Sequence, residues 1–189
     1  TPNNLSLVVA GDIDPAQARA LVEKYFGSIP PGPVLERVRR WVPQLSGEKI
    51  VEAKDTVPVP ATLMRWPGPP YFDPDERPLN LTADILTDGL ASRLQKALIY
   101  DRQLCTSVDA SYQALEVAGA FSVNAIAAPG VALQDIEAVI TAEIARLAAE
   151  GPTQEELDRE KTKREKGFVN GLQRIGGFGG KADKLNEYN

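Results

Sequence analysis

Histidine is missing from this chain, and cysteine occurs only once. The 189 residues contain no histidine and a single cysteine, Cys105. Metallopeptidases, serine and cysteine triads and most general-base arrangements depend on an imidazole, so a chain without one must use carboxylates alone or carry out no chemistry. One cysteine can form neither an intramolecular disulfide nor a cysteine-rich zinc cluster. We therefore expect no catalytic residue, no metal site and no cofactor in the chain itself.

Long apolar runs and an excess of positive charge are lacking as well. No stretch approaches 18 consecutive apolar residues, so we expect no membrane span within the chain. The net charge of −5 gives no electrostatic attraction for nucleic acid or for an anionic membrane surface. What is present is a globular composition, with 43% hydrophobic residues in a chain long enough to bury a substantial core.

The first part of the chain predicts a βα unit followed by a linker. The apolar run Leu5–Ala10 predicts a buried strand, and a helix should follow between Asp14 as its N-cap and Phe26. The prolines and charges of residues 28–44 predict an irregular linker. We therefore expect residues 1–27 to belong to the end of a preceding domain.

Residues 45–189 predict an α+β domain in which helices cover one face of a largely antiparallel sheet. Helices and strands are told apart by the spacing of their apolar residues. Strands are expected at 49–54, 61–66, 106–112 and 120–127, and the last two should form a hairpin. Helices are expected at 78–100 with a break near Gly89, at 133–147, and from Thr153 to Gly176. The core should contain Phe121, Val123, Ile136, Ile140, Ile144, Phe168 and Leu172.

Arg93 is the polar residue whose surroundings are most unusual. Its neighbours Leu90, Ala91 and Leu94 are apolar, and a guanidinium in such surroundings needs a carboxylate partner. That carboxylate can belong to the chain, which makes a structural ion pair, or to a bound ligand such as a substrate. A structural pair is the commoner arrangement for a buried arginine.

Four segments together resemble a known family. They are Pro2–Asp12, an apolar run that ends in Gly-Asp; Lys24–Pro30, with Tyr-Phe-Gly before Ile-Pro; Gly89–Leu94, which ends in Ser-Arg-Leu; and Gly151–Leu157, which opens a helix. In this order and spacing they resemble the C-terminal-type, or second, domain of the M16 zinc metallopeptidases. That pitrilysin-like and insulinase-like family has a fold also described as LuxS/MPP-like metallohydrolase.

The resemblance implies a domain without catalytic groups of its own. In the family, the first domain holds zinc through an inverted His-x-x-Glu-His motif and a downstream Glu, and nothing in this chain corresponds to them. The active second half adds an Arg and a Tyr after the Ser-Arg-Leu segment, and the aligned positions here hold Ile99 and Thr106. The resemblance thus implies a substrate-chamber domain of a bacterial zinc endopeptidase, truncated before its last elements, or alternatively a non-catalytic subunit that acts in assembly or interaction.

The resemblance also implies partners. Zinc is expected in the parent protein, together with a zinc-bearing domain, a second half and a peptide substrate, and exported bacterial members suggest the periplasm. Separation from the preceding domain would expose the edge of the strand at residues 5–10. We therefore expect a homodimer to form through this opening segment.

Overall fold

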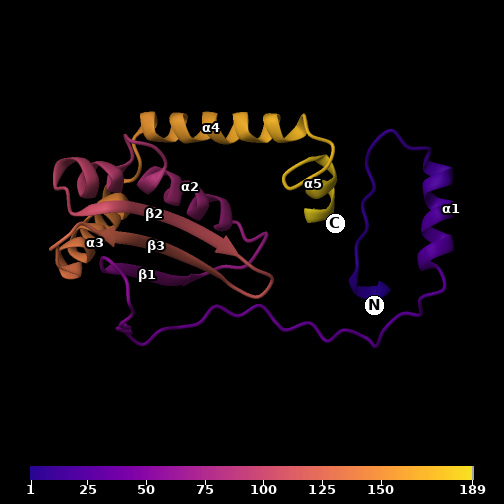
Figure 1. Cartoon of the computed structure of the whole chain (residues 1–189), viewed down its shortest axis with the longest axis horizontal. Coiled ribbons are helices and arrows are strands. Elements are labelled where there is room, and N and C mark those ends of the chain that lie inside the picture. The colour runs from indigo at the N-terminus through magenta and orange to yellow at the C-terminus, as the bar shows by residue number, and fades with distance from the viewer. Residues whose placement is uncertain (189) are drawn as a thin grey trace. The chain divides into compact units, whose positions relative to one another are not determined.

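The fold is built around a three-stranded antiparallel sheet. The structure is a computed structural model that describes residues 1–188. The strands are β1 (Ala61–Gly68), β2 (Cys105–Ala114) and β3 (Gly119–Ala127), in the spatial order β1-β3-β2 (Figure 1). β1 is an edge strand, and this position tolerates its Pro67, which has no N–H to donate to a ladder.

The register places apolar side chains of all three strands on one face of this sheet. Val123 of β3 lies opposite Met64 of β1 and Ala110 of β2, and Phe121 lies opposite Trp66 and Tyr112. Successive side chains of a strand point to opposite faces, so these residues share one side. This side is the inner face of the sheet.

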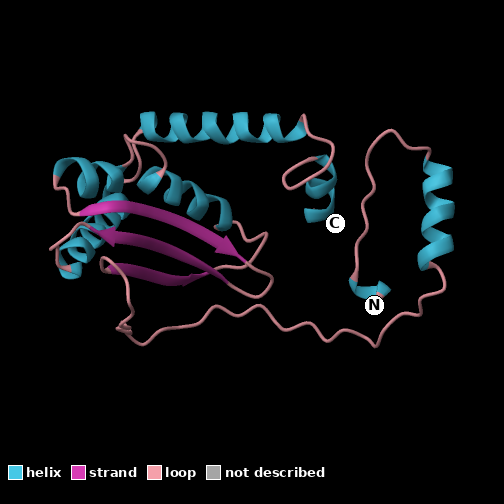
Figure 2. Ribbon diagram, in the orientation of Figure 1, coloured by secondary structure: helices cyan, strands magenta, loops and turns pink. Residues whose placement is uncertain are grey.

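Helices cover the inner face. α2 (Glu76–Thr87) and the π-helical turn η2 (Gln95–Asp101) pack on β2, and α3 (Leu133–Glu150) packs on β1 and β3 (Figure 2). The predicted break near Gly89 is confirmed, because this residue has φ +86° between α2 and η2. Gly151 ends α3 with φ +74°, a conformation that glycine adopts without steric cost. The α+β fold expected from the sequence is therefore confirmed.

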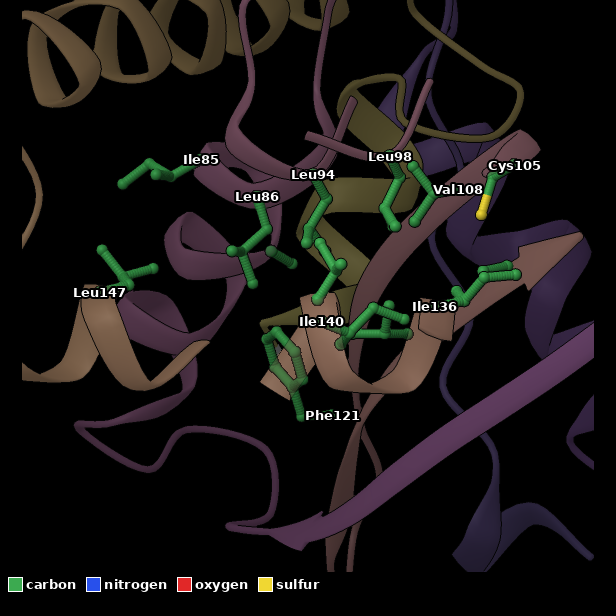
Figure 3. Close-up of a cluster of buried hydrophobic side chains, with 14 of the residues drawn as sticks. Ile85, Leu86, Leu94, Leu98, Cys105, Val108, Phe121, Ile136, Ile140 and Leu147 are labelled. Carbon is green, nitrogen blue, oxygen red and sulfur yellow. The ribbon is translucent and has the colours of Figure 1, made fainter. Parts of the chain in front are cut away.

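The core lies between the inner face and these helices (Figure 3). Leu86 of α2, Leu94, and Leu98 of η2 are fully buried, as are Ile136 and Ile140 of α3. This arrangement confirms the core positions predicted at Phe121, Val123, Ile136 and Ile140, while Ile144 is half-buried against the same cluster.

The chain divides into two compact units. One is Val38–Glu160, which contains the sheet, and the other combines Thr1–Arg37 with the segment from Lys161 onward. The second unit contains η1 (Pro2–Asn4), α1 (Pro15–Phe26) and α5 (Lys181–Glu187), and α4 (Gln154–Leu172) runs from one unit into the other.

Local signals placed the predicted helix α1 correctly. The side chain of Asp14 accepts a hydrogen bond of 2.8 Å from the backbone N–H of Gln17, and Pro15 follows it in the first turn. The domain limits at residues 27, 44 and 45 stay predictions.

Two predicted strands were wrong. Residues 5–10 and 49–54 form no strand, and their side chains are largely exposed; Ile50 and Val51 are exposed to 76% and 77%. A strand requires a hydrogen-bonded partner, and no described segment pairs with either run. The apolar pattern alone could not supply that partner.

Two predicted core residues were also wrong. Phe168 and Leu172 lie in the second half of α4 and are exposed to 55% and 37%. α4 ends at Leu172, before the predicted Gly176. The periodicity places both side chains on one helix face, but no described element buries that face.

We expect Ile140→Ala to lower the free energy of unfolding by about 2–5 kcal/mol, because it removes a fully buried side chain and leaves a cavity. Urea denaturation followed by circular dichroism measures this change. Ile50→Ala makes the same truncation at an exposed site and should cost less than about 0.5 kcal/mol. Equal losses in the two variants would contradict the placement of the core.

Candidate functional site

Arg93 lies in a short segment that the fold holds tightly. The hydroxyl of the buried Ser92 donates a hydrogen bond of 2.6 Å to the carbonyl of Gly89, and the N–H of Ser92 donates to the same oxygen at 3.1 Å. These bonds fix the turn that connects α2 to η2. Arg93 and Leu94 consequently point into the interior, where both are buried.

The partner of Arg93 is Glu156 in the first turn of α4. Nε of Arg93 donates to Oε1 of Glu156 at 2.7 Å, and Nη2 donates to Oε2 at 2.8 Å. Nη2 also donates to the carbonyl of Gly151 at 3.1 Å. This bidentate geometry matches the planar guanidinium to the carboxylate and fixes the relative orientation of the two side chains.

The same carboxylate belongs to the helix cap that opens α4. The backbone N–H of Thr153 donates to Oε2 of Glu156 at 2.8 Å, and the N–H of Glu156 donates to Oγ1 of Thr153 at 3.2 Å. These bonds form a reciprocal capping box, for which Thr-x-x-Glu at residues 153–156 is the typical sequence pattern. Glu156 therefore serves the cap and the ion pair together.

The charges of the pair stabilise each other in a nearly dry environment. The hydrogen bond from Arg93 lowers the pKa of Glu156 to about 2, although burial opposes the shift, and the N–H of Thr153 contributes in the same direction. The hydrogen bond to Glu156 raises the pKa of Arg93. The side chains are exposed to only 6% and 14%, so the carboxylate of Glu156 stays charged mainly because it is paired with Arg93, whose guanidinium is always charged.

The structure thus gives Arg93 a partner within the chain. Its buried Nη1, which carries two N–H donors, has no hydrogen-bond partner among residues 1–188. Contact between Arg93 and a peptide stays a prediction.

Ile99 and Thr106 occupy the positions at which the resemblance implies Arg and Tyr. Ile99 lies in η2 and packs, half-buried, against the core. Thr106 is exposed at a bulge of β2, where the register shifts between Cys105 and Ser107, and its hydroxyl lies 3.4 Å from the carbonyl of Ile126. Neither side chain can act as an electrophile or as a general acid near neutral pH.

Residues 1–188 contain no cluster of three or more His, Cys, Asp or Glu residues that could hold a metal ion. The Cys105 thiol is buried, and burial raises its pKa, so it remains protonated and a poor ligand. The same residues contain no helix that is long and apolar enough to cross a membrane.

The sheet also has a face that the helices leave uncovered, which we call the open face. Its side chains come from alternate residues of the three strands and form four cross-strand rows. In the order β1, β3, β2 the rows are Ala61-Ile126-Ser107, Leu63-Asn124-Asp109, Arg65-Ser122-Ser111 and Pro67-Ala120-Gln113. Those on β3 are half-buried between their neighbours, and most of those on the edge strands are exposed.

The residues of the open face were not among the predicted site residues. The signal existed in the sequence, because Leu63 and Arg65 alternate with Met64 and Trp66 in β1. The alternation along each strand indicates its two faces, but the pattern of a single strand does not show which residues of the neighbouring strands lie opposite one another.

Comparison with known proteins decides the family. The model of the family described as "Peptidase M16 inactive domain" matches residues 1–164. The chain belongs to the M16 peptidase family. No curated protein sequence matches this M16 chain.

Solved structures show the same fold. The M16 chain is similar to a protease from Helicobacter pylori, with a TM-score of 0.73 and 21% identity over 88% of this chain and 41% of that one. It is similar to an M16 inactive domain from Pseudomonas fluorescens, with a TM-score of 0.68 and 24% identity over 82% and 37% of the two chains. The chain therefore spans about two fifths of the length of these two relatives.

A third structure covers a smaller part of the chain. It is a protein from Bordetella pertussis Tohama I described as a candidate zinc protease, with a TM-score of 0.55 and 26% identity over 62% of this chain and 64% of that one. The chain is thus an M16 inactive domain, and the residues described here contain no metal-binding cluster.

We expect Glu156→Gln to destabilise the chain at neutral pH and to lose this effect in acid. The folded-state pKa of Glu156 is about 2, below its ordinary 4.5, so the pair contributes its full stability above pH 4.5 and loses it as pH falls toward 2. Urea denaturation at several pH values should show that the unfolding free energies of wild type and Glu156→Gln converge as pH falls from 4.5 toward 2. Glu155→Gln changes an exposed neighbour and should shift the free energy of unfolding by less than about 0.5 kcal/mol. If the unfolding free energies of wild type and Glu156→Gln differed by the same amount at all pH values, the pairing would be contradicted.

We expect the chain to bind no stoichiometric zinc, because it offers no histidine and one buried cysteine as nitrogen or sulfur ligands. Metal analysis after chelation, addition of zinc and gel filtration measures the bound ion. One tightly held zinc per chain would contradict this expectation.

Proposed function

We propose that this M16 domain forms part of the wall of a peptide chamber in a zinc endopeptidase. The observation that carries the proposal is the open face, a surface of mostly small and polar side chains on a sheet whose other side is fully occupied by the core. Family membership supports the proposal as well, because the chain belongs to a peptidase family and matches the inactive domain of that family.

The open face has the chemistry expected of a surface that contacts many different peptides. Ser107, Ser111, Ser122, Asn124 and Gln113 can both donate and accept hydrogen bonds, as extended peptide backbones require. On the central strand the polar side chains of Ser122 and Asn124 are short and half-buried. The uncharged part of this surface binds weakly and without a strong preference for one side chain, which suits a chamber wall more than a specific pocket.

The chemical step would be supplied by other domains. A zinc-bearing M16 domain and a second half would be the partners, and zinc there would polarise a water molecule for attack on the peptide bond. The role of this chain is to hold the peptide and to exclude water from part of the chamber. Its helices pack on the inner face of the sheet, so that the open face is left for the peptide.

We expect Ser111→Trp to lower kcat/KM of the complete peptidase for an unstructured protein by about tenfold, equivalent to about 1.4 kcal/mol. The indole would occupy the open face, because Ser111 lies on it and is exposed. Hydrolysis of a fluorescently labelled unstructured protein gives the rate.

Ala148→Trp is the matched control, since it adds the same side chain at an exposed position of α3 outside the sheet. It should leave kcat/KM unchanged. Equal rates for wild type and Ser111→Trp would contradict the wall role. A complete protein that hydrolyses no peptide, with or without zinc, would instead favour an assembly or interaction subunit.

A further inference from the structure

The open face carries two charges of opposite sign. Of its twelve positions only Arg65 and Asp109 are charged, and they lie on the two edge strands with the neutral central strand between them. Both residues are exposed. The face is therefore electrically polarised from β1 to β2, although its overall charge is neutral.

The two charges are available to a ligand in different ways. No hydrogen bond or ion pair engages Arg65 within residues 1–188, and the nearest positions across the strands are Ser122 and Ser111, which are neutral. Asp109 accepts a hydrogen bond of 3.2 Å from the side-chain amide of Asn124, its neighbour in the same row. That bond holds the carboxylate above the face without neutralising its charge.

Strand geometry gives the spacing between the two charges. Arg65 and Asp109 are two strands apart, about 9.6 Å, and they lie in adjacent rows, about 6.7 Å apart along the strands. The diagonal between their backbone positions is thus about 12 Å. In an extended peptide, residues i and i+4 point to the same side and are about 13 Å apart, whereas residues i and i+3 point to opposite sides.

We propose that the open face selects extended peptide segments that carry an acidic and a basic residue four positions apart, with the acidic side chain at Arg65 and the basic one at Asp109. This inference rests on the proposed role as a chamber wall and names the class of peptide that the wall favours. The direct line between the two charges crosses the central strand between Ser122 and Asn124, whose neutral side chains are short and half-buried.

Binding of labelled nine-residue peptides to the full 189-residue chain tests the proposal. Three peptides share a Ser/Ala background: one has Glu and Lys four positions apart, one has them three apart, and one has Gln at both positions of the first. Fluorescence anisotropy at low ionic strength gives each Kd. An exposed ion pair contributes about two- to fivefold, so the first peptide should bind about tenfold more tightly than the Gln peptide and clearly more tightly than the second.

Charge reversal identifies the residues responsible. Arg65→Glu should remove most of the preference for the first peptide, and the double variant Arg65→Asp/Asp109→Arg should restore it, because the peptide can bind in the opposite direction. Arg102→Glu makes the same change of charge at an exposed position outside the sheet and should leave all three Kd values unchanged.

The outcomes separate this inference from the proposed function. Equal Kd values for the three peptides, each weakened by Ser111→Trp, would overturn the charge selection and leave peptide binding at the open face standing. Peptide binding that Ser111→Trp does not weaken would overturn both. If Arg102→Glu reduced the preference for the first peptide as much as Arg65→Glu does, the preference would reflect the overall charge of the chain. That result would also overturn the charge selection at the open face.

Discussion

The burial of one face of a three-stranded sheet is the constraint on which the rest of this domain depends. Side chains alternate along each strand, so filling the inner face with Val123, Ala125, Val108 and their neighbours leaves the intervening residues on the other side. α2, η2 and α3 can then cover only the inner face. The open face is therefore a direct consequence of how the core is built.

The Arg93–Glu156 pair joins parts of the domain that are distant in the sequence. It connects the segment after α2 with the turn between α3 and α4, across 63 residues. A buried ion pair adds little net stability compared with apolar residues of the same size, but the loss of one partner leaves an uncompensated charge. The pair therefore favours one arrangement of these elements more than it increases stability.

The family match is to an inactive domain, and the chain contains no histidine. Ile99 and Thr106 occupy the positions at which the resemblance implies Arg and Tyr. What the domain presents instead is the open face, on which Arg65 and Asp109 are the only charged residues. The proposed peptide contacts require a sheet that keeps its shape, and the close-packed core between the sheet and the helices resists deformation.

The sequence by itself determined several local elements and the absence of histidine. The apolar periodicity of α3, the capping box at Thr153 and Glu156 and the glycine after α3 each lie within a few residues, so they could be predicted, as could the lack of histidine ligands. Tertiary structure decided the rest. The apolar runs at 5–10 and 49–54 have the pattern of strands, but no described segment pairs with them. The carboxylate that pairs with Arg93 belongs to a residue far along the chain. The register determined the cross-strand rows of the open face. Pairing depends on contacts between distant segments, and a local pattern does not encode which segments meet.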